Sequence, residues 1–146
     1  MIWKPRTTVA AVVEQDNRFL LVEEEINGEM TLNQPAGHLE ADESLIEAAI
    51  RETQEETAWQ LQPEALVGIY RWIHPRKNET YIRYCFCGAV TQHNPHQELD
   101  GDIHRAVWLT LDEIKAEQHR HRSPLVLQCF EDYLAGQRYS LDLLHN

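Results

Sequence analysis

Gly37-His-Leu-Glu-Ala-Asp-Glu43 and Arg51-Glu-Thr-Gln-Glu-Glu56 are the stretches of this chain that decide its fold and its chemistry. The first stretch is typical of a turn that begins at a glycine. A capping box formed by Ser44 and Glu47 then predicts a helix that begins at Ser44 and ends near Thr57. The second stretch therefore lies on a helix, which brings several carboxylates to one place.

The helical conformation brings acids that are spaced along the sequence onto one face. Residues three and four apart share one face of a helix, so Glu52, Glu55 and Glu56 are expected to lie together. Such carboxylates repel one another where they are partly buried, unless a cation neutralises them. Carboxylate oxygens suit Mg²⁺ or Mn²⁺, whereas a zinc site would draw on His or Cys, which this cluster lacks. The pattern predicts an Mg²⁺ or Mn²⁺ site, and a solvated acidic helix face is the alternative.

Two neighbouring residues favour the metal site over a solvated face. Gly37 stands before Glu43 in a turn that can bring a backbone carbonyl to the metal. Arg51 follows Glu43 at a spacing that allows an ion pair across two helical turns.

The segment from Gly37 to Trp59 resembles the signature of the Nudix hydrolase family, which reads Gly, five residues, Glu, seven residues, Arg-Glu-apolar-any-Glu-Glu-any-Gly-apolar. The first glycine and all charged positions match. Thr53 departs at an apolar position, and Ala58 replaces the second glycine. Ala58 leaves the turn after the helix in doubt, because a left-handed residue is strained without glycine.

A narrower resemblance, to a group of bacterial Nudix phosphatases, extends through residues 33–43, 72–75, 122–126 and 136–139. It implies an α/β fold, the Nudix α/β/α sandwich with a mixed β-sheet between helices, in a single domain of residues 1–146. It also implies Mg²⁺-dependent hydrolysis of phosphoanhydride bonds in nucleoside tri- and diphosphates. Thiamine diphosphate and its hydroxymethylpyrimidine diphosphate precursor are further implied substrates.

The family resemblance also implies roles for individual residues. Glu52, Glu55 and Glu56 are expected to bind the metal, together with a backbone carbonyl near Gly37. Arg51 is expected to orient these ligands, with Glu43 as its partner, and so to belong to the catalytic group.

The general base stays open at this stage, because members of the family differ. Glu52 of the helix is one candidate. Three acids of a distant loop are the others, namely Glu98, Asp100 and Asp102, for which a solvated turn is the alternative.

The organic part of the substrate calls for aromatic and polar side chains. Trp72, Tyr70 and Tyr84 are candidates to stack on a flat ring, although core packing is the more common role for any one aromatic residue. Arg76 is the main candidate to bind phosphate, with Lys77 and Arg83 as others. Gln34, or its neighbour Asn33, could hydrogen-bond a base edge, with turn structure as the alternative. The expected substrate-binding residues are therefore Trp72, Arg76, Tyr84 and Gln34.

The remaining chain alternates apolar runs with polar turns, which predicts strands. They are expected over residues 7–14, 19–24, 30–34, 65–73, 80–90 and 106–109. A capping box at Thr110 and Glu113 begins another helix, and the apolar spacing after Ser123-Pro124 predicts a last one. The hairpin of strands 65–73 and 80–90 is a candidate rim for the substrate, and residues 92–102 form an acidic loop.

Composition restricts the partners and the location of the protein. With 13 basic and 24 acidic residues the net charge is −11, which argues against a nucleic-acid polymer as partner. A small polyanionic substrate would need local positive charge from metal and arginines. No apolar run could span a bilayer and no signal peptide is evident, so a soluble cytoplasmic protein is expected, as a monomer or small homo-oligomer. The three cysteines are expected to be buried free thiols.

Two alternative functions remain from the sequence. One is a Nudix pyrophosphohydrolase acting on ADP-ribose or a dinucleotide polyphosphate. The other is a catalytically silent module that binds a nucleotide to sense it, although the complete set of acids argues against this.

Overall fold

A mixed β-sheet forms the centre of the computed structural model, which describes residues 2–146. The strands are β1 (Arg6–Gln15), β2 (Arg18–Ile26), β3 (Glu29–Asn33), β4 (Ala36–His38), β5 (Trp59–Ile73), β6 (Thr80–His93) and β7 (Ile103–Leu109). The α-helices are α1 (Leu45–Thr57), α2 (Leu111–Ala116) and α3 (Leu125–Leu134). Two short 3-10 helices cover Gln118–Arg120 and Leu141–Leu143.

Strand β1 is the central element of the sheet. It pairs in parallel with β6 and antiparallel with β2 and β4. The strand order is β3-β2-β1-β6-β5, while β4 lies beside β1 and β7 beside β2. The predicted mixed sheet is confirmed, and its parallel pair joins two strands that are far apart in the sequence.

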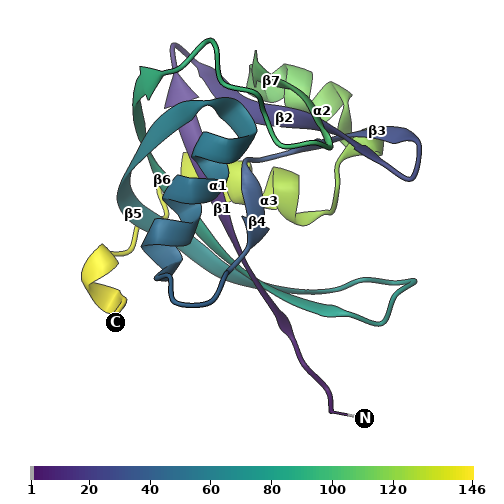
Figure 1. Cartoon of the computed structure of the whole chain (residues 1–146), viewed down its shortest axis with the longest axis vertical. Coiled ribbons are helices and arrows are strands. Elements are labelled where there is room, and N and C mark those ends of the chain that lie inside the picture. The colour runs from purple at the N-terminus through teal and green to yellow at the C-terminus, as the bar shows by residue number, and fades with distance from the viewer. Residues whose placement is uncertain (1) are drawn as a thin grey trace.

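Two apolar clusters lie on opposite faces of this sheet, because successive strand residues point to opposite sides. Helix α1 contributes Ala48 and Ala49 to one cluster, around Phe86. Helix α3 contributes Phe130 to the other, which contains Cys85. Figure 1 shows α1 in front of the sheet and α3 behind it, so the predicted α/β/α arrangement is confirmed.

Local signals in the sequence predicted the helices well. Ser44 is the N-cap of α1, and both hydrogen bonds of its capping box with Glu47 are present. Thr110 and Glu113 form the same arrangement at α2. All three cysteines are buried and free, as expected.

The start of β5 was predicted wrongly. The strand begins at Trp59, directly after α1, and not at Ala65. Its register with β6 shifts at three points, one of them next to Pro63. These irregularities interrupt the alternation of polar and apolar residues, and β5 tolerates a proline because it lies at the edge of the sheet. The strand predicted over residues 106–109 likewise begins earlier, at Ile103.

Among residues 2–146, no helix combines the length and the apolar composition that crossing a bilayer requires.

Ala58, which ends α1, has the left-handed backbone conformation that its place in the signature implied, with φ 62°. A side chain in this region costs about 1–2 kcal/mol, whereas glycine adopts it freely. We expect Ala58→Gly to raise the free energy of unfolding by about 0.5–1 kcal/mol, because the relief of strain exceeds the entropy cost of glycine. Chemical denaturation measures the change.

Ala135, the residue that ends α3, provides a matched control. Its φ is −72°, which an alanine adopts without strain. Ala135→Gly should therefore lower the stability slightly. A loss of stability in both variants would mean that Ala58 is not strained.

Candidate active site

Arg51 holds the acidic residues of α1 and its preceding turn in place. Its Nη2 and Nε atoms donate to the two oxygens of Glu43 at 2.7 and 2.9 Å, which is a bidentate pair. Its Nη1 donates to Glu52 at 2.8 Å and to Glu55 at 3.3 Å. The hydrogen bond from Arg51 holds the pKa of Glu43 below its usual range. The predicted ion pair between Glu43 and Arg51 is confirmed.

Gly37 provides the space that the Glu52 side chain occupies. A Cβ atom at Gly37 would lie 2.1 Å from the Cδ atom of Glu52, closer than any two such atoms can approach. The antiparallel pairing of β4 with β1 fixes Gly37 opposite Val9, beneath the helix. Burial raises the pKa of Glu52, although Arg51 opposes this shift. The first glycine of the motif is therefore required by packing against a carboxylate.

Glu56 lies one turn further along α1 and is only 7% exposed. Its Oε1 atom accepts a hydrogen bond of 2.9 Å from the backbone N–H of Ala36. Burial, with a further contribution from the charges of Glu52 and Glu24, raises its pKa to about 9. A carboxylate in this position needs positive charge nearby to ionise at neutral pH.

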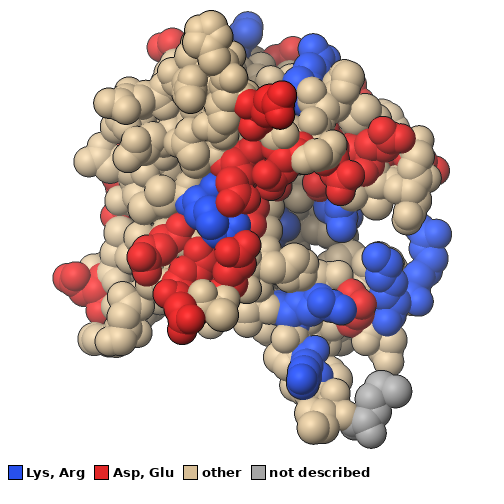
Figure 2. Space-filling view, viewed as in Figure 1, with Lys and Arg blue, Asp and Glu red and all other residues tan. Residues whose placement is uncertain are grey.

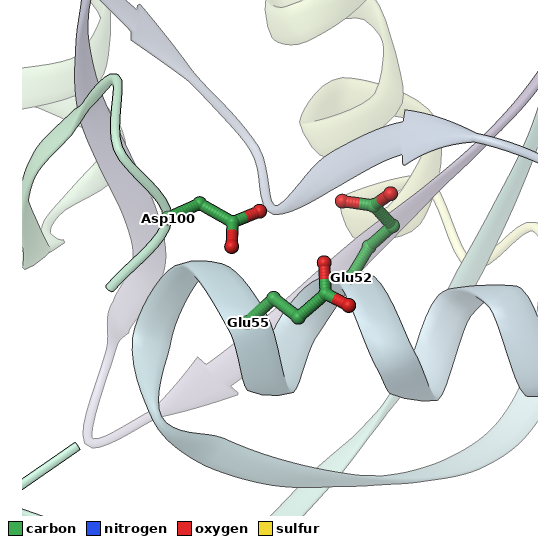
Figure 3. A group of neighbouring side chains, drawn as sticks. All are labelled: Glu52, Glu55 and Asp100. Atoms are coloured by element: carbon green, nitrogen blue, oxygen red, sulfur yellow. The ribbon is translucent and has the colours of Figure 1, made fainter. Parts of the chain in front are cut away.

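Asp100 completes the acidic cluster from the loop between β6 and β7. One carboxylate oxygen each of Glu52, Glu55 and Asp100 lie within 4.8 Å of one another. Figure 3 shows the two glutamates side by side on α1, with Asp100 facing them from the loop. Burial and the charge of Asp100 raise the pKa of Glu55. Three crowded carboxylates, which repel one another when ionised, are a donor set that fits a hard divalent cation.

The loop that carries Asp100 is tied to the helix that carries the glutamates. The backbone N–H of Asp100 donates to the carbonyl of Glu55 at 3.1 Å. Gln97 donates to the carbonyl of Gln54 and accepts from its side chain, both at 2.6 Å. Of the three loop acids considered from the sequence, Asp100 is the one that joins Glu52 and Glu55. Glu98 and Asp102 lie outside this group, although Asp102 lines the groove described below.

A groove of about 400 Å³ opens beside the acids. One wall contains Glu52, Glu56 and Gly37, and the other contains residues from β1, β2, β3, β5, β6 and the start of α3. Among them are Thr8, Glu24, Asn33, Trp72, Tyr81, Arg83 and Leu125, while Asp102, Arg122 and Ser123 line the groove from connecting segments. A neighbouring groove of about 440 Å³ shares Trp72 and Arg122 with the first and includes Arg76. Figure 2 shows a band of acidic side chains across this side of the molecule and basic side chains next to it.

The structure brings only part of the expected substrate-binding set to these grooves. Trp72 lines both of them, and Arg76 lines the second. Tyr84 instead packs against the apolar cluster beneath α1, because it points to the opposite face of β6 from Arg83. Gln34 is fully buried and donates to the carbonyl of Ala11. The expectation that Tyr84 and Gln34 face the substrate therefore has to be corrected.

Sequence reasoning missed Glu24 and Arg122, which form an ion pair of 3.2 Å on the wall of the groove. Glu24 lies on β2, far from the motif in sequence. Arg122 was within a segment that resembles the bacterial phosphatases, so a signal for it existed.

Comparisons with known proteins agree with this fold. The model of the Nudix domain matches residues 4–129. The chain belongs to the Nudix hydrolase family, and is thus an enzyme that acts on phosphorus-containing acid anhydrides. It is 44% identical over 143 residues to the phosphatase NudJ of Escherichia coli K12, covering 98% of this chain and 92% of that protein.

Solved structures give the same result. A NUDIX hydrolase from Nitrosomonas europaea has a TM-score of 0.96 and 53% identity, with 98% of this chain and 97% of that chain covered. A MutT NUDIX hydrolase from Burkholderia pseudomallei has a TM-score of 0.75 at 18% identity, covering 88% of this chain and 98% of that chain, and supports the fold alone.

Proposed function

We propose that this protein is an Mg²⁺- or Mn²⁺-dependent phosphatase acting on nucleoside tri- and diphosphates and on thiamine-type diphosphates. The last group comprises hydroxymethylpyrimidine diphosphate and thiamine diphosphate. The observation that carries the proposal is the meeting of Glu52, Glu55 and Asp100 beside a groove lined by aromatic and basic side chains. The similarity to the phosphatase NudJ supports the reaction, and we expect the enzyme to work in the cytoplasm.

The metal would be held by Glu52, Glu55 and Asp100, with Glu56 and a backbone carbonyl near Gly37 as further ligands. A divalent ion supplies charge neutralisation for the diphosphate and acidifies water that it binds. The chain itself contributes orientation. Arg51 holds Glu52 and Glu55 at hydrogen-bond distance, and Glu43 holds Arg51 in turn.

The proton acceptor in this proposal is Glu52 or Asp100. Both carboxylates lie in the cluster, so either can reach a water next to it. Burial raises the pKa of Glu52, which makes it a stronger base. Asp100 is the more exposed of the two.

A second candidate function is a pyrophosphohydrolase for ADP-ribose or a dinucleotide polyphosphate. The observation in its favour is the second groove, which joins the first at Trp72 and has space for another substrate moiety. A silent nucleotide-sensing module is the least supported alternative, because every charged position of the motif is filled.

Product analysis distinguishes these functions. With Mg²⁺ or Mn²⁺ present, we expect orthophosphate from nucleoside triphosphates and from hydroxymethylpyrimidine diphosphate, and no release after chelation with EDTA. Chromatography of the nucleotide products and a phosphate assay measure the two outcomes. Faster release of AMP from ADP-ribose would support the second candidate instead. Absence of turnover on all of these compounds would refute both enzymatic proposals.

A further inference from the structure

Arg83 is a buried cation on the floor of the groove. It is 7% exposed and lies on β6, next to Thr8 of β1. Its Nη1 donates to Oε1 of Gln34 at 2.8 Å, and Gln34 is itself held by the backbone of Ala11. Arg122, which also lines the groove, pairs with Glu24, whereas no carboxylate within residues 2–146 lies at ion-pair distance from Arg83. A guanidinium that is buried with a neutral amide partner is costly, unless a ligand completes its hydrogen bonding.

The side-chain oxygen of Asn33 is a second buried group of the same groove, and it lacks a hydrogen-bond partner. Asn33 is also 7% exposed, and its Oδ1 atom has no hydrogen-bond donor. Its Nδ2 atom donates to Glu24 at 3.5 Å, and this orientation of the amide is favoured because the opposite one would set two oxygens against each other. Buried acceptors without a donor are rare in folded proteins, and a ligand that donates explains this one.

Aromatic rings flank these two groups. Trp72 and Tyr81 have ring centroids 5.8 Å apart at an interplanar angle of 33°, and both line the groove. The ring of His38 lies 6.4 Å from that of Tyr81. Such aromatic surfaces favour a ligand with a flat aromatic ring that can stack on them.

We propose that Arg83 and Asn33 recognise the edge of a planar nitrogen heterocycle, and that this edge carries a hydrogen-bond acceptor and an N–H donor. Arg83 donates to the ring nitrogen or carbonyl oxygen, and Oδ1 of Asn33 accepts from the exocyclic amine. Gln34 acts as a positioning residue for Arg83. An aminopyrimidine such as cytosine has this pair of groups. The inference rests on the proposed function and adds to it the pair of residues that recognises the ring.

Kinetics on two substrates test the inference. CTP carries the heterocycle, whereas inorganic tripolyphosphate offers the same anhydrides without a ring. We expect Asn33→Leu and Arg83→Gln to lower kcat/KM for CTP by about ten- to a hundredfold, mainly through KM, because each removes a hydrogen bond to the ring. Turnover of tripolyphosphate should stay within about twofold of wild type in Asn33→Leu. In Arg83→Gln, which also removes a positive charge from the groove, it should fall clearly less than that of CTP.

Thermal unfolding distinguishes a ligand-binding role of Asn33 from a structural one, because loss of a structural role would lower the stability of the free protein. Asn33→Leu removes an acceptor that lacks a donor, so the free protein should be as stable as the wild type or more stable. Arg71→Gln is the control for the loss of a positive charge, because Arg71 is an exposed residue of β5 next to Trp72. This variant should leave kcat/KM for CTP and the turnover of tripolyphosphate close to wild type.

A thiolate at Cys129, next to Arg83, is the competing explanation for the buried cation. Cys129→Ala should leave kcat/KM for CTP within about twofold of wild type if the ligand is the missing partner of Arg83. A loss as large as that of Arg83→Gln would overturn the assignment of Arg83.

Other results would also overturn the inference. These are equal losses on CTP and tripolyphosphate in both groove variants, or no loss on either substrate. If the wild-type enzyme hydrolyses neither compound, the part of the proposed function that concerns nucleoside triphosphates fails separately. An NMR titration with cytidine, which carries no phosphate, then decides the inference alone: saturable binding that both groove variants weaken supports it, and absence of binding refutes it.

Discussion

Glu56→Gln is expected to lower metal-dependent turnover by about a thousandfold, the scale at which loss of one well-placed electrostatic group acts in an active site. The metal-free variant should nevertheless be at least as stable as the wild type. Glutamine retains the oxygen that accepts from Ala36, and it removes a carboxylate that is buried near Glu52. Phosphate release with Mg²⁺ and thermal unfolding in EDTA measure the two effects.

The stability effect of Glu56 depends on pH in a direction that can be derived. Because the pKa of Glu56 is raised to about 9 in the folded metal-free protein, the folded state favours the protonated acid. The contribution to stability is present at low pH and is lost as the pH rises through about 9. The variant lacks this loss, so its advantage should grow as the pH rises from about 4.5 to about 9 and level off above that.

Glu64→Gln is the matched control for this change. Glu64 is an exposed residue of β5 and should tolerate the substitution without an effect on turnover. Full activity of Glu56→Gln would refute the assignment of Glu56 to the metal site. A large loss of metal-free stability would instead mean that the carboxylate has a structural role.

Gly37→Ala should have a comparable effect on turnover through packing. The new Cβ would lie 2.1 Å from Cδ and 2.3 Å from Oε1 of Glu52, so the carboxylate has to leave its place beside Arg51. We expect turnover to fall by at least about a hundredfold, and the free energy of unfolding to fall by about 1–3 kcal/mol from overpacking. Steady-state kinetics and chemical denaturation measure the two quantities.

Gly101→Ala is the control for Gly37→Ala, because no heavy atom lies within 4 Å of a Cβ at Gly101. It should leave activity and stability close to wild type. Normal turnover in Gly37→Ala would show that Glu52 works equally well from another position.

The sequence predicted those parts of the site that depend on local spacing. Helix α1, its capping box and the pair of Glu43 and Arg51 all follow from residues within two or three turns of one another. The left-handed turn at Ala58 also followed from its place in the motif. Local geometry is sufficient here, because the backbone of a helix fixes the directions of its side chains.

Contacts between distant segments escaped sequence reasoning. Asp100 could not be selected over its neighbours, since its position depends on hydrogen bonds between the loop and the end of α1. Tyr84 and Gln34 were assigned to the substrate, although the register of β6 and the burial of the segment after β3 direct them into the interior. The shifts in the pairing of β5 with β6 hid the true start of that strand.

The paired amides of Gln54 and Gln97 have a consequence for how this scaffold can be redesigned. They hold the 94–102 segment against the final turn of α1. Asp100 is therefore already in position in the free protein, and little conformational entropy is lost when an ion binds. Replacing the loop between β6 and β7 to alter selectivity should therefore succeed only where the new loop keeps the two hydrogen bonds between Gln54 and Gln97.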